Sequence, residues 1–474
     1  SYFSAVVFVG YAGQFGWKYG IAATWAGIGN AVLGSLLAWV VLGRRTRIMT
    51  QHLDSATMPE FFGRRFGSAS LKIAASVIIF IFLIPYTASL YNGLSRLFGM
   101  AFDIDYSVCV IVMAILTGVY VIAGGYMATA INDFIQGIIM LFGICAVIGA
   151  VLGSQGGFTA ALTKLAQVSG ETASGPAAGA PGVFASFFGP DPVNLLGVVI
   201  LTSLGTWGLP QMVQKFYAIK SEKSINTGTV ISTLFAMVVS GGCYFLGGFG
   251  RLFAGVVGVT EAGTPVGGFD AVIPAMLSGL PDLLLAVVVI LVLSASMSTL
   301  SSLVLTSSST LTLDLLKGHI VKEMDEKRQV FVMRCLIVVF IAISVVLAII
   351  QYKSSVTFIA QLMGVSWGAL AGAFLAPFLY GLYWRGTTKI ACWVSFVFST
   401  AVMLADISPL KAYFPAILVS PINCGAFCMI AGLVIVPVVS LFTAKPRREL
   451  VDDVFACYEE KVTVRKSQAL GDPQ

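Results

Sequence analysis

The 474-residue sequence carries little charge. Asp, Glu, Lys and Arg together make up 11% of it, against about 25% in ordinary soluble domains. Hydrophobic residues make up 57%, and the mean hydropathy is +0.92. This composition argues against a soluble fold, and it also excludes a collagen-like or disordered chain.

Histidine is scarce, and cysteines in paired spacing are absent. The two histidines, His52 and His319, both lie in predicted loops. The cysteines lie mostly inside apolar runs without the C-x-x-C spacing of a metal site, so we interpret them as buried small hydrophobes. No nucleophile motif accompanies them, and we therefore expect no enzyme. The eight cysteines are Cys109, Cys145, Cys243, Cys335, Cys392, Cys424, Cys428 and Cys457.

Long apolar segments dominate the chain instead. About 20 apolar residues cross one bilayer as a helix, which satisfies its own backbone groups. The sequence thus predicts an all-α polytopic membrane protein. The first segment is too short to span and opens without Met, so we expect a further piece upstream of Ser1. Twelve segments are predicted, at residues 1–15, 17–42, 70–99, 105–122, 126–152, 193–218, 226–257, 282–316, 329–351, 355–383, 388–407 and 414–442.

The basic residues predict an orientation in the membrane. If the loops alternate between the two sides of the membrane, 22 of the 28 Lys and Arg residues fall on one side and the remaining six on the other. Basic residues accumulate on the cytoplasmic side. We therefore expect a multi-pass protein of the cell membrane with a cytoplasmic C-terminus from about residue 443. Because the cations are spread over many short loops, we expect no nucleic-acid partner. The side with few cations receives Lys18, Arg96, Lys164, Arg251, Lys353 and Lys411.

Two segments carry Gly and Pro in their interiors. The sixth contains residues 205–211 (GTWGLPQ), and the first contains the looser run 10–13 (GYAG). A broken helix frees backbone groups that can bind an ion or a substrate near the midplane. The two runs are five helices apart, as expected for inverted repeats that meet at one site. The alternative is that these residues only pack helices.

The eighth segment carries hydroxyl groups in its middle. Ala295, Ser298 and Thr299 share one helical face, and Ser298, Ser301 and Ser302 repeat that spacing one turn further on. A hard cation such as Na⁺ prefers several oxygen ligands. The alternative is that the hydroxyls bond to their own helix or join neighbouring helices.

Asp133 is an ionisable residue within the fifth segment. It lies about 10 Å from the predicted start of that helix, at about 1.5 Å per residue. An ionisable group at such depth marks a functional site by default. The alternative is a cap at the start of the helix.

These motifs resemble the sodium:solute symporter family, and within it the bacterial sodium/proline symporter branch. The resemblance runs from Ser1 to about Lys445 and depends on residues 58–66 (MPEFFGRRF), 124–136 (GGYMATAINDFIQ) and 295–299 (ASMST). It implies a leucine-transporter-type inverted repeat of five plus five helices. The implied parts are a first repeat with a truncated first helix (1–153), an external loop (154–191), a second repeat (192–383), two accessory helices (384–442) and a cytoplasmic tail (443–474).

The resemblance also implies roles for individual residues. Sodium would be held by Ala295, Ser298 and Thr299 with a backbone oxygen of Phe3, and Asp133, Ser298, Ser301 and Ser302 look like a second sodium site found in some members. Ser4 and Tyr86 align with substrate-site positions. The aromatic positions of the proline transporter fall here at Thr202 and Thr206, with Trp207 displaced by one, and this smaller wall would suit a bulkier or more hydroxylated solute.

We therefore expect a sodium-coupled secondary active symporter that imports a small organic solute, with proline or a related amino acid first. The alternatives are a sodium symporter for a sugar, a carboxylate or a pantothenate-like solute, or a transporter-like membrane sensor. A channel is disfavoured because the polarity is confined to a few helices. The expected partners are the solute and the lipid bilayer, and no obligate protein partner is evident.

Overall fold

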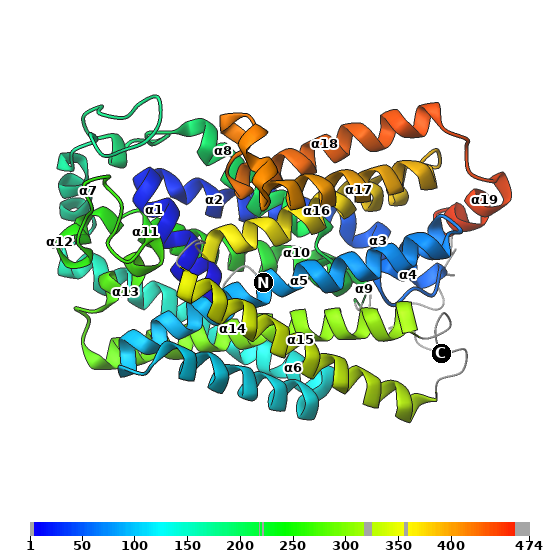
Figure 1. The fold of residues 1–474 in the computed structure, drawn as a ribbon, viewed down its shortest axis with the longest axis horizontal. Coiled ribbons are helices and arrows are strands. Elements are labelled where there is room, and N and C mark those ends of the chain that lie inside the picture. The colour runs from blue at the N-terminus through cyan, green and yellow to red at the C-terminus, as the bar shows by residue number, and fades with distance from the viewer. Residues whose placement is uncertain (1–3, 218, 220–221, 317–324, 355–358, 460–474) are drawn as a thin grey trace, which may run out of the picture.

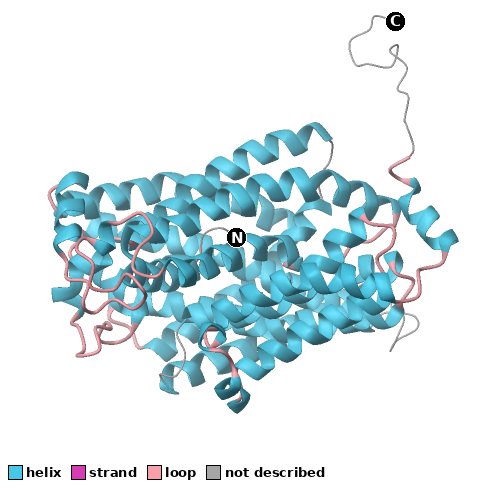
Figure 2. Ribbon diagram, turned by 90° about the horizontal axis from the view of Figure 1, so that it is seen from above, coloured by secondary structure: helices cyan, strands magenta, loops and turns pink. Residues whose placement is uncertain are grey.

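The computed structural model describes residues 4–217, 219, 222–316, 325–354 and 359–459, without the side chains of residues 124–133, 222, 223 and 354. Within these ranges every named element is a helix, and Val259 and Pro265 form an isolated β-bridge. Most of the loops gather at the two ends of the bundle (Figure 2). The helices thus run along one common direction, as the segment pattern predicts.

The first helical stretch turns back on itself at Gly20. The chain runs to one end of the bundle in α1 and returns through α2 to α3 at the other end (Figure 1). The turn requires a φ of 61° at residue 20. Glycine adopts this angle readily, whereas residues with a Cβ disfavour it. The elements are η1 (Val6–Ala12), α1 (Gly13–Tyr19), η2 (Gly20–Ala23), α2 (Thr24–Gly29), η3 (Asn30–Leu37), η4 (Trp39–Gly43) and α3 (Arg44–His52).

The next elements are α4 (Met58–Arg65), α5 (Ala69–Phe102) and α6 (Tyr106–Ser154). The fourth and fifth predicted segments both lie in α6, whose 49 residues form one continuous helical element rather than two helices joined by a loop. At about 1.5 Å per residue it would measure about 73 Å if straight, more than twice the thickness of a hydrocarbon core. Residues Tyr106–Ala123 and Phe134–Ser154 each qualify as a membrane span.

The sixth predicted segment is a broken helix. Its two parts, α8 (Pro192–Gly208) and α9 (Pro210–Tyr217), are bent by 45° relative to each other. Leu209 between them has an extended backbone, and Pro210 cannot donate the hydrogen bond that would continue α8. The break therefore lies inside the run where the sequence predicts it. The preceding loop carries α7 (Phe158–Gln167) and η5 (Val183–Ala185).

The run in the first segment does not break. η1 continues into α1 with helical backbone angles at Ala12 and Gly13. The glycines there serve packing instead, since a Cβ on Gly10 would lie 2.7 Å from Ile359 Cγ2 and a Cβ on Gly13 would lie 2.9 Å from the Phe269 carbonyl oxygen. The alternative of helix packing therefore holds for this run.

The second half of the chain completes the bundle. In α16 (Ile359–Tyr383), 89% of the most apolar stretch is buried inside the protein, against 22% in α15 (Glu326–Ser354). α16 therefore lies at the centre of the bundle. The elements are α10 (Glu222–Phe235), η6 (Ala236–Ser240), α11 (Gly241–Gly247), η7 (Gly250–Phe253), α12 (Ala254–Val257), η8 (Phe269–Ala271), α13 (Val272–Leu277), α14 (Asp282–Thr310), η9 (Leu311–Leu316), α15 (Glu326–Ser354), α16 (Ile359–Tyr383), α17 (Lys389–Asp406), η10 (Pro409–Tyr413), η11 (Ala416–Leu418), α18 (Pro421–Phe442) and α19 (Arg448–Ala456).

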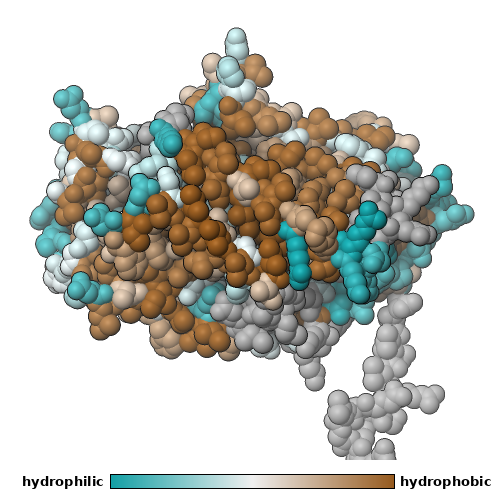
Figure 3. Space-filling view, turned by 60° about the horizontal axis from the view of Figure 1, so that its bottom comes forward, coloured by the Kyte–Doolittle hydropathy of each residue, from teal (hydrophilic) through white to brown (hydrophobic). Residues whose placement is uncertain are grey.

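The surface fits a lipid environment. Ten helices in the described ranges are long and apolar enough to cross a membrane, or eleven if α8 and α9 count as one span. Apolar side chains cover the middle of the face seen in Figure 3, and polar ones lie toward both ends. The large exposed hydrophobics, such as Val119, Phe142 and Leu441, would contact acyl chains rather than water.

Candidate functional site

The beginning of η1 lies beside α14 in the middle of the bundle. The backbone N–H of Ala5 donates to Ser296 Oγ at 2.8 Å, and Ser296 is fully buried. Ser296 lies near the middle of the 35-residue span Asp282–Leu316. The first described residues of the chain thus meet the hydroxyl-rich part of α14 near the middle of that span.

The predicted sodium ligands on α14 lie at the same depth. Ala295 and Thr299 are buried, and Ser298 is half-buried. Thr299 Oγ1 donates to the Ala295 carbonyl at 3.1 Å. This is a hydrogen bond of a hydroxyl to its own helix, as the alternative interpretation of these residues expects. A hydroxyl that donates one hydrogen bond keeps two lone pairs on its oxygen, so this bond leaves Thr299 able to coordinate a cation. Phe3 lies outside the described residues.

The structure describes the serines of the predicted second sodium site. Ser301 Oγ donates to the Ser298 carbonyl at 3.0 Å, and Ser302 is half-buried. α14 packs extensively against α6, which carries Asp133. The side chain of Asp133 lies outside the described residues, so this site stays a prediction.

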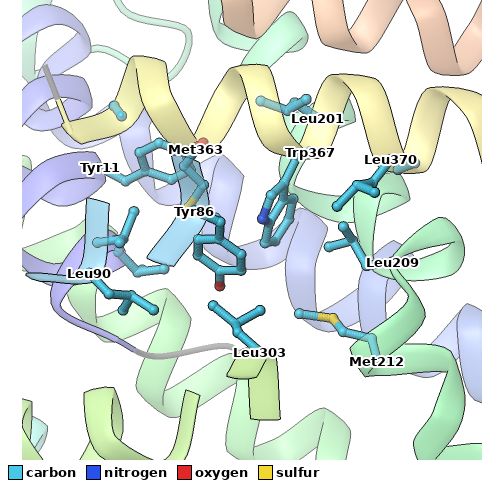
Figure 4. Close-up of a cluster of buried hydrophobic side chains, with 14 of the residues drawn as sticks. Tyr11, Tyr86, Leu90, Leu201, Leu209, Met212, Leu303, Met363, Trp367 and Leu370 are labelled. Carbon is cyan, nitrogen blue, oxygen red and sulfur yellow. The ribbon is translucent and has the colours of Figure 1, made fainter. Parts of the chain in front are cut away.

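Tyr86 on α5 and Trp367 on α16 form an aromatic pair inside the bundle. Their ring centroids are 5.9 Å apart at an angle of 82°, and Tyr86 is fully buried. Figure 4 shows the pair among Leu303, Met212 and other apolar side chains. Trp367 Nε1 faces Tyr86 Oη, and the Tyr86 hydroxyl finds no acceptor among the described residues. An unsatisfied donor in an apolar enclosure favours a polar ligand, because a buried polar group without a partner costs free energy.

Ser4 lies at the start of the first helix and is fully buried. Its hydroxyl accepts a hydrogen bond from the Val7 N–H at 3.4 Å, so it caps the beginning of η1. Gly93 of α5 packs closely against the neighbouring Ala5. The predicted substrate residues Ser4 and Tyr86 therefore belong to two elements that are in contact.

Three further substrate residues were predicted on α8. Thr206 Oγ1 donates to the Gly34 carbonyl at 2.9 Å, and Trp207 Nε1 donates to the Leu33 carbonyl at 2.9 Å. These bonds hold both side chains against η3. Thr202 Oγ1 donates to the Val198 carbonyl of its own helix at 2.9 Å. Their role in a substrate wall stays a prediction.

The face of α8 that meets Trp367 carries Gly205 instead. A Cβ at Gly205 would lie 2.5 Å from Trp367 Cε3. The large aromatic side chain opposite Tyr86 therefore comes from α16, and sequence reasoning missed it. The available signal was a tryptophan beside Gly364 and Gly368 in the tenth segment, where small residues let neighbouring helices approach.

Two buried carboxylates lie toward opposite ends of α5. At one end Arg96 Nε lies 3.7 Å from Asp270 Oδ2, which also accepts from the Ile359 N–H at 3.3 Å. Burial raises the pKa of Asp270 to about 6, and Arg96 opposes this shift. At the other end Lys72 Nζ lies 3.2 Å from Asp314 Oδ1, and Thr57 donates to Asp314 Oδ2 at 2.6 Å. The first pair joins α5 to η8, and the second joins α5 to η9.

Comparison with known proteins agrees with this architecture. The family model of the sodium:solute symporter family matches residues 1–397. The osmoregulated proline transporter OpuE of Bacillus subtilis is 25% identical over 439 residues, covering 90% of this chain and 82% of that protein. A sodium/proline symporter of Staphylococcus aureus is 28% identical over 461 residues, covering 90% and 80%.

Solved structures share the fold. A Na⁺-coupled sialic acid symporter in a substrate-bound outward-open state has a TM-score of 0.69 at 15% identity, over 94% of this chain and 88% of that one. Mhp1, a nucleobase-cation-symport-1 family transporter, has a TM-score of 0.53 at 13% identity, over 96% and 93%. The predicted leucine-transporter-type fold is thus confirmed. With a family model that covers most of its length, the chain belongs to the sodium:solute symporter family.

Proposed function

We propose that this protein is a sodium-coupled symporter that imports proline or a closely related small amino acid. The observation that carries the proposal is the hydrogen bond from Ala5 to Ser296, which joins the start of the first helix to the hydroxyl-rich part of α14. Two relatives named for proline transport, at 25% and 28% identity, support the choice of solute.

In this proposal Na⁺ binds between η1 and α14. Its ligands are the Ala295 carbonyl, the hydroxyls of Ser298 and Thr299, and a backbone oxygen of Phe3. Neutral oxygens suit a monovalent hard cation, because they replace its hydration shell without adding buried charge. Asp133, with Ser298, Ser301 and Ser302, is the proposed place for a second ion, whose charge the carboxylate would neutralise.

The solute binds beside the sodium site, against the aromatic pair of Tyr86 and Trp367. Ser4 caps the same turn of η1 that Ala5 anchors to α14. Sodium that orders this turn therefore also orders one wall of the solute site, while Thr202, Thr206 and Trp207 lie on the α8 side. By reciprocity of coupling, the solute must then strengthen sodium binding by the same factor. The membrane potential contributes about 2.3 kcal/mol per charge per 100 mV.

We further propose that the C-terminus from about residue 443 is cytoplasmic, because 22 of the 28 basic residues fall on that side of the predicted topology. On this basis residues 1–153 and 192–383 form the two repeats, residues 154–191 an external loop, and residues 384–442 the accessory helices.

The test is uptake of radiolabelled proline into proteoliposomes. We expect accumulation under an inward Na⁺ gradient and equilibration only when K⁺ replaces Na⁺ or an ionophore collapses the gradient. Uptake that ignores the gradient would contradict sodium coupling. A competition panel of amino acids, sugars and carboxylates identifies the solute, and failure of proline to compete would contradict the proposed substrate.

A further inference from the structure

A cavity of about 310 Å³ lies between η3, η4, the broken helix of α8 and α9, and α10. This volume falls at the lower end of the range for ligand sites. Among the described residues, no residue of α14 lines the cavity, and neither do Tyr86 and Trp367. The cavity is therefore separate from the proposed sodium ligands on α14 and from the central aromatic pair.

The walls of this cavity favour an apolar occupant. The ring centroids of Trp39 and Phe216 are 5.0 Å apart at one wall. Both hydroxyls of the lining are already engaged, since Thr206 Oγ1 donates to a backbone carbonyl of η3 at 2.9 Å, and Ser232 and Ser35 share a hydrogen bond of 2.7 Å. A wall whose polar atoms are satisfied suits an acyl chain. The large apolar side chains of the lining are Trp39, Met212, Phe216, Ile231 and Phe235.

The cavity is accessible from the surface that would face lipid. Ile231 of α10 lines it and is 62% exposed. On the opposite wall, Leu37 and Val40 flank the lining residues Ala38 and Trp39, and both are exposed. Large exposed hydrophobics in a membrane protein contact acyl chains rather than water. A chain of the bilayer can therefore enter the cavity from the side.

Two cations lie at the end of the cavity that is predicted to be cytoplasmic. Lys215 of α9 lines the cavity and is exposed. Arg44, the first residue of α3, is also exposed. It follows Gly43, which lies close to α9, because a Cβ added to Gly43 would be 3.8 Å from Phe216 Cδ1. Basic pockets between membrane helices on the cytoplasmic side favour anionic lipid headgroups.

We propose that this cavity binds an anionic phospholipid of the cytoplasmic leaflet. One acyl chain lies against Trp39 and Phe216, and Lys215 Nζ donates to a phosphate oxygen, while Arg44 adds a second positive charge nearby. A zwitterionic phospholipid also fits the apolar walls, but its own cation compensates the phosphate, so the basic residues select the anionic lipid. This inference goes beyond the proposed function, because it concerns the bilayer rather than the solute.

A lipid in this cavity contacts both parts of the broken helix. Thr206 of α8 and Met212 of α9 line the cavity on either side of Leu209, where the helix is interrupted. The two parts are bent by 45° relative to each other at this point. The proposed site therefore places an acyl chain directly against the bend.

The test is quenching of tryptophan fluorescence by lipids with brominated acyl chains, measured on the purified protein in detergent micelles. Bromine quenches an indole ring that it contacts, so the part of the quenching that is lost in Trp39→Phe reports on the cavity. We expect dibrominated phosphatidylglycerol to quench Trp39 at about fivefold lower mole fraction than dibrominated phosphatidylcholine, because one basic residue near the headgroups adds an attraction of that size. Quenching that does not depend on Trp39 would overturn the site, and equal mole fractions for the two lipids would overturn the choice of an anionic lipid.

Trp393 is the internal control for this experiment. It lines another apolar cavity between α5 and α17, which has no charged residue among its described lining residues. The part of the quenching that is lost in Trp393→Phe should therefore be equal for the two lipids. A preference for phosphatidylglycerol at Trp393 as strong as at Trp39 would show a general attraction to the protein and would contradict a specific site.

Lys215→Met tests the role of the cation. This variant should keep the quenching of Trp39 by phosphatidylcholine and lose the fivefold preference for phosphatidylglycerol. The matched control is Lys389→Met, which removes an exposed cation on the same predicted side but outside the cavity and should keep the preference. An unchanged preference in Lys215→Met, or displacement of the lipid by an equimolar amount of soluble glycerol phosphate, would overturn the lipid site. Each variant is first checked for monodispersity and for an unchanged melting temperature in phosphatidylcholine.

Discussion

Removal of the Thr299 hydroxyl tests the sodium site most sharply. Thr299 is 3% exposed, and its Oγ1 already donates to the Ala295 carbonyl at 3.1 Å, so Thr299→Ala removes one proposed ligand and one local hydrogen bond. An interaction with a charged group contributes about 1.5–3 kcal/mol, and about 1.4 kcal/mol corresponds to a factor of ten. We therefore expect the half-saturating Na⁺ concentration for uptake to rise about 10- to 100-fold. Thr299→Ser keeps the oxygen and should stay within a few-fold of wild type.

Thr312→Ala is the matched control for this experiment. Thr312 lies further along the same span, is fully buried, and donates to the Ser308 carbonyl at 2.7 Å, so the same chemical group and the same kind of hydrogen bond are lost. Both alanine variants should lose about 1 kcal/mol of stability. The assay is the initial rate of proline uptake as a function of external Na⁺ at constant ionic strength. An unchanged Na⁺ requirement in Thr299→Ala, or an equal shift in Thr312→Ala, would refute the reasoning.

Three further predictions concern the surroundings of the site. Gly205→Ala places a Cβ against Trp367 and should raise the KM for proline about tenfold, because overpacking costs about 1–3 kcal/mol. The control is Gly255→Ala, which has no atom within 4 Å of the added Cβ and should leave uptake unchanged. Equal kinetics for the two variants would exclude Trp367 from the solute site. Burial raises the pKa of Asp270 to about 6 from its ordinary value of 3.8, so the folded state binds the proton of this carboxyl more tightly than the unfolded state does. The protonated carboxyl therefore contributes to stability below pH 4, and this contribution is lost as the pH rises through 6. Asp270→Asn should flatten that decline in a thermal unfolding series, and an unchanged slope would count against this assignment. Lys72→Met leaves Asp314 buried without its cation and should cost about 3 kcal/mol in thermal unfolding, whereas Lys164→Met should change stability by less than about 0.5 kcal/mol; similar melting temperatures would show that the buried pair matters little.

The helices could be predicted because backbone N–H and C=O groups in hydrocarbon must form hydrogen bonds within the protein, and a helix satisfies them. Apolar length fixes where a helix lies, and Pro210 after Gly208 fixes where α8 must end, since proline cannot donate the next hydrogen bond. Glycine alone does not carry this information. Residues Gly10 to Gly13 stay helical, because the effect of a glycine depends on the helix opposite.

The sodium and solute residues were predictable to different degrees. Serine and threonine in the middle of α14 stand out in an apolar segment, so their spacing already indicates a common face. Trp367 does not stand out, because tryptophan is common in membrane helices and its role depends on Gly205 of another helix. The same limit applies to Thr206 and Trp207, whose hydrogen bonds to η3 follow from how α8 is rotated.

Flux of ²²Na⁺ into proteoliposomes tests the central claim most directly, because it follows the ion rather than the solute. The claim is that neutral oxygens between η1 and α14 hold a sodium ion whose entry drives import of the solute. We expect external proline to stimulate ²²Na⁺ influx in wild type and to lose most of that effect in Thr299→Ala at low Na⁺. Influx that is the same with and without proline, while labelled proline still enters, would contradict the account.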